Sequence, residues 1–356
     1  MLTIGLVGLP NVGKSTLFNA LTNANALVAN YPFATIDPNV GIVDVIDGRL
    51  NELAKIYNSE KITPATLNIT DIAGLVKGAS KGEGLGNQFL SHIRSCQAIV
   101  QVVRVFEDDK ITHVDQDYSP KKDIEIINTE LILADLESLE KRIDKIGKEA
   151  KANPKLKDYL NEYLKAKEIL NSGRPLWTTD DKFEFLNDLF LLTMKPILYV
   201  FNIDENNINN DQLKKELSLL VSPSPLILLC AKLEAELSGL DQYDKQELLE
   251  SYGQKQPGLD TLTKYLYDLL GLQSFLTAGQ KEVRAWTIKK GSTAPQAAGV
   301  IHSDFEKGFI AAEIVNYDDL LKAGSLNAAR SAGKVRTEGK NYIVKDNDII
   351  EFRFNI

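Results

Sequence analysis

The chain has few of the features that mark secreted and membrane proteins. Among its 356 residues there are two cysteines, Cys96 and Cys230, which are too few for a disulfide framework. No apolar run approaches the roughly 20 residues that a membrane-spanning helix needs. The N-terminus enters an apolar, strand-like segment without the basic stretch of a signal peptide. These absences predict a cytoplasmic protein without a membrane segment.

An excess of basic charge is also lacking. Lys and Arg number 41 against 49 Asp and Glu, which gives a formal net charge of −8 at pH 7. This balance argues against a protein that coats nucleic acid through bulk electrostatics, but it leaves room for a local basic face. The length and the ordinary composition, with 44% hydrophobic and 25% charged residues, predict two or three globular domains.

A glycine loop near the N-terminus is the most specific motif. The segment Gly8–Ser15 has the pattern G-x-x-x-x-G-K-S, follows the apolar run Leu2–Val7 and precedes residues of helical character. A strand, this loop and a helix start together form a phosphate-binding loop. Its glycines let successive N–H groups point at phosphate oxygens, and the helix N-terminus adds positive charge. The sequence therefore predicts a nucleoside triphosphate as ligand.

The other parts of a nucleotide switch follow in order. Lys14 is expected to reach the β- and γ-phosphates in a catalytic role, and Ser15 to place its hydroxyl on Mg²⁺. Thr35, in a loop after the first helix, is expected to bind the same Mg²⁺ through its hydroxyl. The D-x-x-G motif that begins at Asp71 ends a strand-like segment. There Asp71 would touch the Mg²⁺ shell, and the N–H of Gly74 would sense the γ-phosphate.

The water-positioning residue of Ras-type enzymes is missing. Those enzymes have a glutamine directly after the D-x-x-G motif, whereas this chain has Leu75, which neither donates nor accepts a hydrogen bond. Either hydrolysis is slow or another group positions the water. A packing role for Leu75 in a switch segment is the plainer alternative.

The base-binding loop also departs from the guanine pattern. Guanine specificity normally comes from an N-K-x-D loop, whose aspartate accepts two hydrogen bonds from the guanine edge. Here the loop reads Asn202-Ile203-Asp204-Glu205, without the lysine and with a longer carboxylate. Adenine offers an acceptor at N7 and an amino donor, which an asparagine and a backbone carbonyl satisfy. We therefore expect ATP rather than GTP, with Ala231 of the loop Cys230–Lys232 beside the base.

Hydrophobic patterning predicts an α/β fold with one insertion. Residues 1–125 and 195–273 contain short apolar runs typical of buried parallel strands. Residues 126–194 have charged, helical spacing, which indicates an inserted helical hairpin, either a solvated structural arm or a partner-binding arm. Residues 274–356 read as a separate α+β module that ends in a hairpin of Tyr342–Val344 with Ile349–Phe354.

These segments resemble the YchF group of Obg-like ATPases over essentially the whole chain. The resemblance implies a P-loop GTPase-type fold, doubly wound with a mostly parallel sheet, an inserted antiparallel coiled-coil domain and a C-terminal ubiquitin-like TGS domain. It also implies a preference for ATP, association with the ribosome, and a role in translation or stress responses. The segments that carry it are Gly8–Ser15, Asn30–Asn39, Asp71–Gln88, Asn202–Glu205, Arg284–Thr287 and Ala294–Gly299.

The resemblance also assigns roles by position. It implies that Asn202 and Ile203 hold the adenine, with Glu205 in the same loop, and that His113 on a loop replaces the missing glutamine. On sequence grounds alone a loop histidine is more often inert. Ala34 stands where the family usually has a cysteine, which puts redox sensitivity there in doubt. The residues expected to hold the phosphates are Asn11, Val12, Gly13, Lys14, Ser15 and Thr16.

The sequence thus predicts a monomeric, ATP-hydrolysing switch that reports its nucleotide state to the ribosome. Its cofactor is Mg²⁺, and K⁺ beside Asn11 is a further option taken from some relatives. RNA contact through the TGS domain is an option too, because residues 274–356 carry 12 Lys/Arg against 10 Asp/Glu. Two alternatives stay open: an Obg-type GTPase whose Glu205 still reads guanine, and a nucleotide-gated binding module with incidental hydrolysis.

Overall fold

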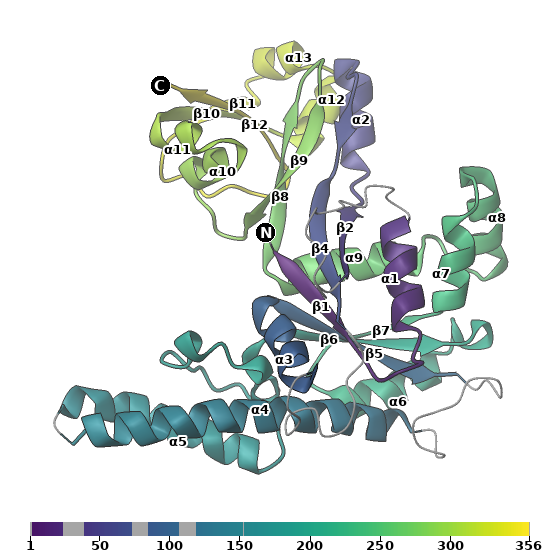
Figure 1. Ribbon diagram of the computed structural model, residues 1–356. Coiled ribbons are helices and arrows are strands. Elements are labelled where there is room, and N and C mark those ends of the chain that lie inside the picture. The colour runs from purple at the N-terminus through teal and green to yellow at the C-terminus, as the bar shows by residue number, and fades with distance from the viewer. Residues whose placement is uncertain (1, 24–38, 73–84, 107–118, 152, 356) are drawn as a thin grey trace. The chain divides into compact units, whose positions relative to one another are not determined.

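The computed structural model describes residues 2–23, 39–72, 85–106, 119–151 and 153–355 (Figure 1). The chain divides into two compact units. The first unit comprises Met1–Val43 and Asn68–Thr261, and the second comprises Asp44–Leu67 and Leu262–Ile356. No helix among the described residues is long and apolar enough to cross a bilayer.

The first sheet has the strand order β2-β4-β1-β5-β6-β7. β1 pairs in parallel with β4 and β5, β5 with β6, and β6 with β7. All seven residues of β6 are buried, as expected for a parallel strand that is covered on both faces. This confirms the predicted doubly wound, mostly parallel fold. The strands are β1 Thr3–Val7, β2 Asn39–Val45, β4 Ala65–Asp71, β5 Ala98–Val105, β6 Ile197–Ile203 and β7 Leu226–Leu229.

Helices follow most of these strands, and one pair of them forms the insertion. The helix bounds are α1 Lys14–Asn23, α3 Leu85–Ser95, α4 Pro120–Glu149, α5 Lys157–Asn171, α6 Asp211–Val221, α7 Ala231–Ser238, α8 Gln242–Ser251 and α9 Gly258–Leu269. Short 3₁₀ turns lie at η1 Pro154–Leu156, η2 Leu176–Thr178, η3 Asn187–Leu189, η4 Leu192–Met194 and η5 Glu205–Asn207.

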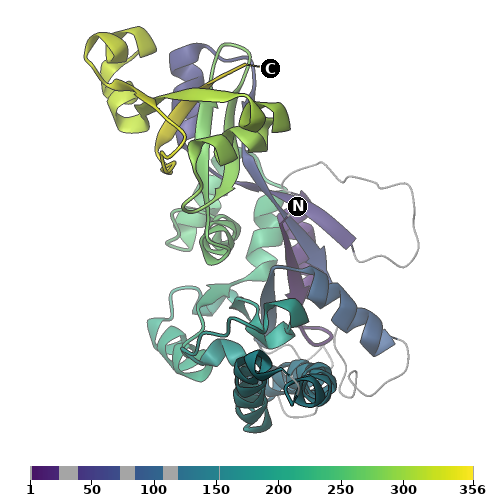
Figure 2. The same ribbon diagram turned by 90° about the vertical axis from the view of Figure 1, so that its left-hand side faces the viewer.

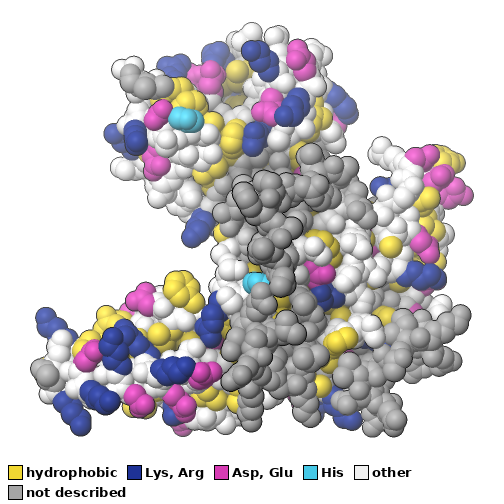
Figure 3. Space-filling view, viewed as in Figure 1, with side chains coloured by type: hydrophobic (Ala, Val, Ile, Leu, Met, Phe, Trp, Pro, Cys, Tyr) yellow, Lys and Arg dark blue, Asp and Glu magenta, His cyan; other side chains and the backbone are white. Residues whose placement is uncertain are grey.

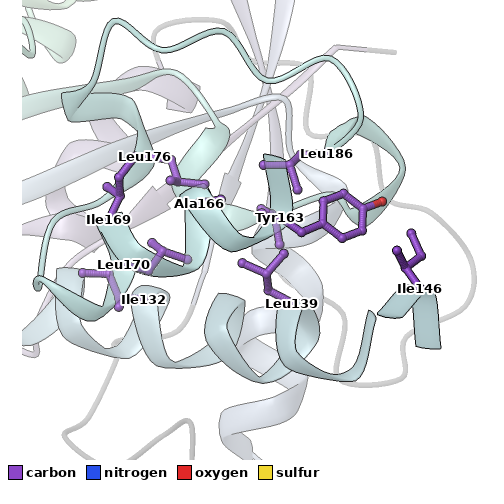
Figure 4. Close-up of a cluster of buried hydrophobic side chains, with 10 residues drawn as sticks. Ile132, Leu139, Ile146, Tyr163, Ala166, Ile169, Leu170, Leu176 and Leu186 are labelled. Atoms are coloured by element: carbon purple, nitrogen blue, oxygen red, sulfur yellow. The ribbon is translucent and has the colours of Figure 1, made fainter. Parts of the chain in front are cut away.

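α4 and α5 form an antiparallel hairpin, which we call the arm (Figures 1 and 2). Ser119 caps α4 and Pro120 occupies its first turn, which is where a helix tolerates proline. Apolar side chains at helical spacing face each other between the two helices, and Leu139 and Tyr163 are fully buried there (Figure 4). Full burial of such a side chain stabilises the fold by roughly 1.5–3 kcal/mol. The arm therefore has its own core, which confirms the predicted inserted helical hairpin.

A buried carboxylate joins the arm to the sheet. Asp135 of α4 accepts hydrogen bonds from the backbone N–H of Leu192 at 2.8 Å and of Thr193 at 2.7 Å. It also accepts one from the Thr193 hydroxyl at 2.7 Å. Burial raises the pKa of Asp135, while these donors favour its charged form. Because Thr193 lies just before β6, Asp135 fixes the return of the chain into the sheet.

The second unit contains a mixed sheet with the order β11-β10-β12-β8-β9-β3. Its core packs Phe275, Ile288 and Phe309 against the alanines of α10. This is the small α+β module predicted for the C-terminal part. The elements are α2 Arg49–Tyr57, β3 Ile62–Thr63, β8 Leu272–Ala278, β9 Val283–Lys289, α10 Ala294–Ile301, α11 Ser303–Lys307, β10 Phe309–Asn316, α12 Tyr317–Ala323, α13 Leu326–Ser331, β11 Val335–Glu338 and β12 Asp348–Phe354.

The predicted terminal hairpin is wrong. β12 pairs with β10 and β8 instead of with Tyr342–Val344, where the structure has only an isolated bridge from Ile343 to Thr293. The Tyr342 hydroxyl donates to Asp348 at 2.8 Å, and the N–H of Lys345 donates to the same carboxylate oxygen at 2.8 Å. These bonds hold the segment in a turn, which leaves the ladder positions beside β12 to strands from elsewhere in the unit.

The sequence contains no local signal that Asp44–Leu67 packs with the C-terminal residues. Arg49 at the start of α2 donates to the Asp346 carbonyl at 2.7 Å and to the Asn347 side chain at 2.8 Å. Burial opposes the charged form of Arg49, yet the carboxylates of Asp47 and Asp346 raise its pKa above the ordinary value. β3 adds in parallel to β9, so the segment extends the second sheet.

A second buried carboxylate holds the start of α9. Glu234 of α7 accepts the N–H of Gly258 at 2.7 Å, and its other oxygen lies 3.4 Å from the N–H of Leu259. These are among the first N–H groups of α9, which have no partner within the helix. Burial raises the pKa of the Glu234 carboxyl to about 7, although the two N–H donors act in the opposite direction.

We expect Glu234 to make stability fall between acid and neutral pH. Its folded pKa lies above the unfolded value of 4.5, so its stabilising effect is complete below that value and is lost as the pH rises through about 7. The loss is about 3 kcal/mol for a shift of this size. Glu234→Gln keeps an acceptor for Gly258 without the charge, so urea unfolding at acid and neutral pH will show less pH dependence than in the wild type.

A matched control is Glu247→Gln, because Glu247 is exposed on the neighbouring helix α8. This variant is expected to keep the wild-type pH dependence. Parallel pH profiles for the wild type and Glu234→Gln would contradict the assignment.

Candidate nucleotide-binding site

A cavity of about 1080 Å³ lies in the first unit beside the carboxyl ends of β1, β6 and β7. Ligands bind at this edge of open α/β sheets. The cavity brings together three loops that are far apart in the sequence, and it includes most of the predicted site residues. The lining residues are Leu9, Pro10, Asn11, Gly13, Lys14, Ser15, Thr16, Phe106, Asn202, Ile203, Asp204, Glu205, Asn206, Cys230, Ala231, Lys232, Ala235 and Glu236.

The phosphate loop has the backbone that its sequence requires. Gly13 has φ +91°, a left-handed conformation that favours glycine, and Asn11 has φ +64°, which asparagine tolerates better than most residues. α1 begins directly afterwards at Lys14, so the free N–H groups and the positive end of the helix dipole belong to the cavity wall. This arrangement is built to hold an anion.

Asn202 joins the phosphate loop to the base side of the cavity. Its side-chain Nδ2 donates to the Val12 carbonyl at 2.9 Å, and its Oδ1 accepts the N–H of Ala231 at 3.0 Å. The residue is buried, with 5% of its surface exposed. A Cβ atom on Gly13 would stand 2.2 Å from Asn202 Nδ2, so only glycine fits there. One amide therefore fixes two loops against each other.

The metal side of the site is formed by Lys14, Ser15 and Asp71. Asp71 ends β4, next to Leu6 in β1, which places it beside the phosphate loop. One carboxylate oxygen accepts a hydrogen bond from Lys14 Nζ, and the other lies 3.5 Å from the Ser15 hydroxyl. A carboxylate and a hydroxyl are the oxygen ligands that Mg²⁺ takes from phosphate-loop proteins. The Ser15 hydroxyl and the Asp71 carboxylate fit a Mg²⁺ ion. The described ranges contain no group of three or more His, Cys, Asp or Glu side chains that could hold a metal.

The base side contains an ion pair that the sequence prediction missed. Glu205 Oε1 lies 2.8 Å from Lys232 Nζ, and hydrogen bonding to Glu205 raises the pKa of Lys232. Asp204 turns instead to its own loop, where it accepts the N–H of Asn207 at 3.1 Å. Phe106 also lines the cavity, with the Arg104 guanidinium 4.5 Å from its ring centre. Phe106 follows β5 and Lys232 follows β7, and the parallel pairing of both strands with β6 was the available signal.

Several predicted site residues lie outside the described residues. They are Thr35, Gly74 and His113, together with Leu75 and Ala34, which depart from the family pattern. Their roles stay predictions.

We expect Asn202→Ala to weaken nucleotide binding about 10- to 100-fold. The change leaves a buried carbonyl and a buried N–H unpaired, at about 1–3 kcal/mol each, and frees the phosphate loop from the base loop. Equilibrium binding of a fluorescent ATP analogue measures the effect. Asn161→Ala, at an exposed position on α5, is the matched control and should bind like the wild type. An Asn202→Ala protein with wild-type affinity would contradict the bridging role.

The doubly wound parallel sheet, with a phosphate loop after β1 and a second loop after β6, defines a P-loop nucleotide-binding protein of the GTPase fold. Family models agree. A model described as a 50S ribosome-binding GTPase matches residues 3–156, and the YchF GTPase C-terminal model, described as a protein of unknown function, matches residues 272–355. The chain belongs to the YchF family, as the sequence predicted.

Full-length relatives support this membership. The chain is 53% identical over 364 residues to a protein of Bacillus subtilis named ribosome-binding ATPase YchF, with all of both chains covered. It is 47% identical over 360 residues to a protein of the same name from Escherichia coli O157:H7, with 99% of each covered. A solved Schizosaccharomyces pombe YchF GTPase superposes with a TM-score of 0.86 at 39% identity, covering 99% of this chain and 97% of that one.

Proposed function

We propose that the protein is an ATP-hydrolysing molecular switch that associates with the ribosome. The phosphate loop and the base loop line one cavity, Asp71 contacts Lys14 of the phosphate loop, and the full-length relatives carry the name ribosome-binding ATPase. Ribosome association places the protein in the cytoplasm, and a monomer is the expected state. Contact of the C-terminal residues 274–356 with RNA belongs to the same proposal.

The Glu205–Lys232 pair is the observation that carries the preference for ATP. Guanine presents two neighbouring donors that need a free carboxylate, and Glu205 Oε1 is already paired with Lys232 at 2.8 Å. Adenine presents an acceptor at N7 and an amino donor. The amide nitrogen of Asn202 has two hydrogens, of which Val12 takes one, so the second is assigned to N7. The carbonyl of Ile203, which also lines the cavity, is assigned to the amino group.

Positioning and electrostatics supply the catalysis in this proposal. The phosphates lie along the amides of Asn11 to Thr16, and Lys14 exchanges its contact with Asp71 for phosphate oxygens. Ser15, Asp71 and Thr35 hold Mg²⁺, which when bound neutralises charge on the β- and γ-phosphates. Gly74 senses the γ-phosphate, and His113 takes the place of the absent glutamine in orienting water. In the same proposal, Asn11 takes part in binding a K⁺ ion.

Competition binding tests the choice of base. A fluorescent ATP analogue bound to the wild type should be displaced by ATP at concentrations at least about tenfold lower than by GTP. XTP is the third competitor. A shifted guanine-type site, which uses the Glu205 carboxylate, accepts GTP, whereas an adenine site that does not use this carboxylate rejects both GTP and XTP. GTP affinity that equals or exceeds ATP affinity would overturn the ATP proposal.

Lys232→Met should narrow the gap between ATP and GTP. The change frees the Glu205 carboxylate to accept hydrogen bonds from guanine, and an exposed ion pair is worth about 0–1 kcal/mol, or up to about fivefold in relative affinity. Lys255→Met, at an exposed position outside the cavity lining, is the matched control. A ratio of ATP to GTP affinity that is the same in both variants would show that Lys232 takes no part in selecting the base.

A further inference from the structure

Two neighbouring carboxylates, Asp204 and Glu205, line the base end of the nucleotide cavity. Guanine presents its N1–H and its 2-amino group side by side, so a carboxylate that is free to accept from both would bind it. The ion pair with Lys232 engages only Glu205. Asp204 has the shorter side chain and stands one position nearer to Asn202. Exclusion of guanine therefore requires a partner for Asp204 as well.

The partner of Asp204 is Asn207. The side-chain Nδ2 of Asn207 lies 3.0 Å from each of the two oxygens of the Asp204 carboxylate. The backbone N–H of Asn207 donates to Oδ1 of the same carboxylate at 3.1 Å. Both carboxylate oxygens are thus engaged within the loop. The cavity is lined by Asn206 but not by Asn207, so Asn207 acts on the site through Asp204.

A chain of hydrogen bonds fixes which way the Asn207 side chain points. At the start of α6, the N–H of Leu213 donates to Asn210 Oδ1 at 3.0 Å. Asn210 Nδ2 in turn donates to Asn207 Oδ1 at 2.8 Å. Because its oxygen is used in this way, Asn207 turns its nitrogen toward Asp204, and an ionised carboxylate needs a donor there. The first turn of α6 thus holds the Asp204 carboxylate against its own loop.

The helices beside the base end are acidic. Residues 231–251, which form α7 and α8, contain six Asp or Glu against two Lys, and Asp and Glu side chains are visible over these helices (Figure 3). Among the lining residues the cations are Lys14, at the metal end, and Lys232, which is paired with Glu205. An Asp204 carboxylate released from its loop would therefore take its hydrogen bonds from the bound base.

From this network we propose that Asn207 is a specificity-positioning residue, which excludes guanine by holding the Asp204 carboxylate inside the base loop. The inference rests on the ATP preference proposed above and deepens it. Two contacts then make the base pocket reject GTP, namely Lys232 on Glu205 and Asn207 on Asp204. A merely structural role of Asn207 would change the affinities for ATP and GTP by the same factor, whereas a positioning role changes their ratio.

Asn207→Asp tests the role of Asn207 directly. The substitution keeps the size of the side chain and an oxygen for Asn210, but it replaces the donor to Asp204 by a second carboxylate, which repels the first. Asp204 is expected to turn toward the cavity. In competition against a fluorescent ATP analogue, the ratio of ATP to GTP affinity should fall at least about fivefold, the worth of about one net hydrogen bond. ITP lacks the 2-amino group of guanine and should gain less than GTP.

Asn209→Asp is the matched control. It introduces the same charge two positions further along the same loop and removes the donor to the Tyr252 carbonyl at 2.8 Å, while the contact between Asp204 and Asn207 stays. Its ratio of ATP to GTP affinity should remain within about twofold of the wild type, because a charge outside the cavity lining acts alike on both triphosphates. Equal ratios in the Asn207→Asp and Asn209→Asp variants would overturn the proposal.

Two further variants separate release of Asp204 from damage to the loop. Asn207→Ala removes the side-chain donor without adding charge and should lower the ratio in the same direction. The double variant Asp204→Asn with Asn207→Asp exchanges the two groups, so an amide at position 204 again pairs with a carboxylate at position 207. Its ratio should return to the wild-type value. A double variant that keeps the raised GTP affinity would overturn the proposal, because a group other than Asp204 would then accept from guanine.

The wild-type measurement separates this inference from the proposed function. Wild-type protein that binds GTP as tightly as ATP would sink the ATP preference and the role of Asn207 with it. Wild-type protein that prefers ATP, with an unchanged ratio in Asn207→Asp and Asn207→Ala, would sink the role of Asn207 and leave the ATP preference standing.

Discussion

The amide of Asn202 is the contact on which the nucleotide site depends. It is buried and satisfies the Val12 carbonyl on one side and the Ala231 N–H on the other. The phosphate loop, the loop after β6 and the loop after β7 therefore hold one geometry, although some 190 residues separate Val12 from Asn202. This contact requires a glycine at position 13, because a Cβ atom on Gly13 would occupy the space of the Asn202 amide nitrogen.

Around this bridge, charge divides the cavity into two ends. At the metal end, Lys14 and Asp71 contact each other beside the Ser15 hydroxyl, so neither of these two charges is left unpaired. At the base end, the Lys232 ammonium forms an ion pair with the Glu205 carboxylate. Glu205, which stands at the position of the guanine-reading aspartate, therefore already has a cationic partner.

Local patterns in the sequence were enough to predict much of the fold and of the nucleotide site. The phosphate loop, the buried parallel strands and the arm follow from glycine spacing and from apolar periodicity. Contacts between distant segments were not predictable in this way. Arg49 meets Asp346 across 297 positions, and Lys232 meets Glu205 only because the carboxyl ends of β6 and β7 adjoin. The strand predicted at Tyr342–Val344 failed because a side-chain bond to Asp348 outweighed β propensity.

A crystal structure with a non-hydrolysable ATP analogue and Mg²⁺ would test the roles of Asn202, Lys14 and Asp71 together. The account predicts that Lys14 Nζ leaves Asp71 for the phosphate oxygens, that Asp71 faces the metal, and that Asn202 keeps its bonds to Val12 and Ala231 while the adenine lies against it. An adenine bound away from Asn202, or an Asn202 amide released from both loops, would contradict the account.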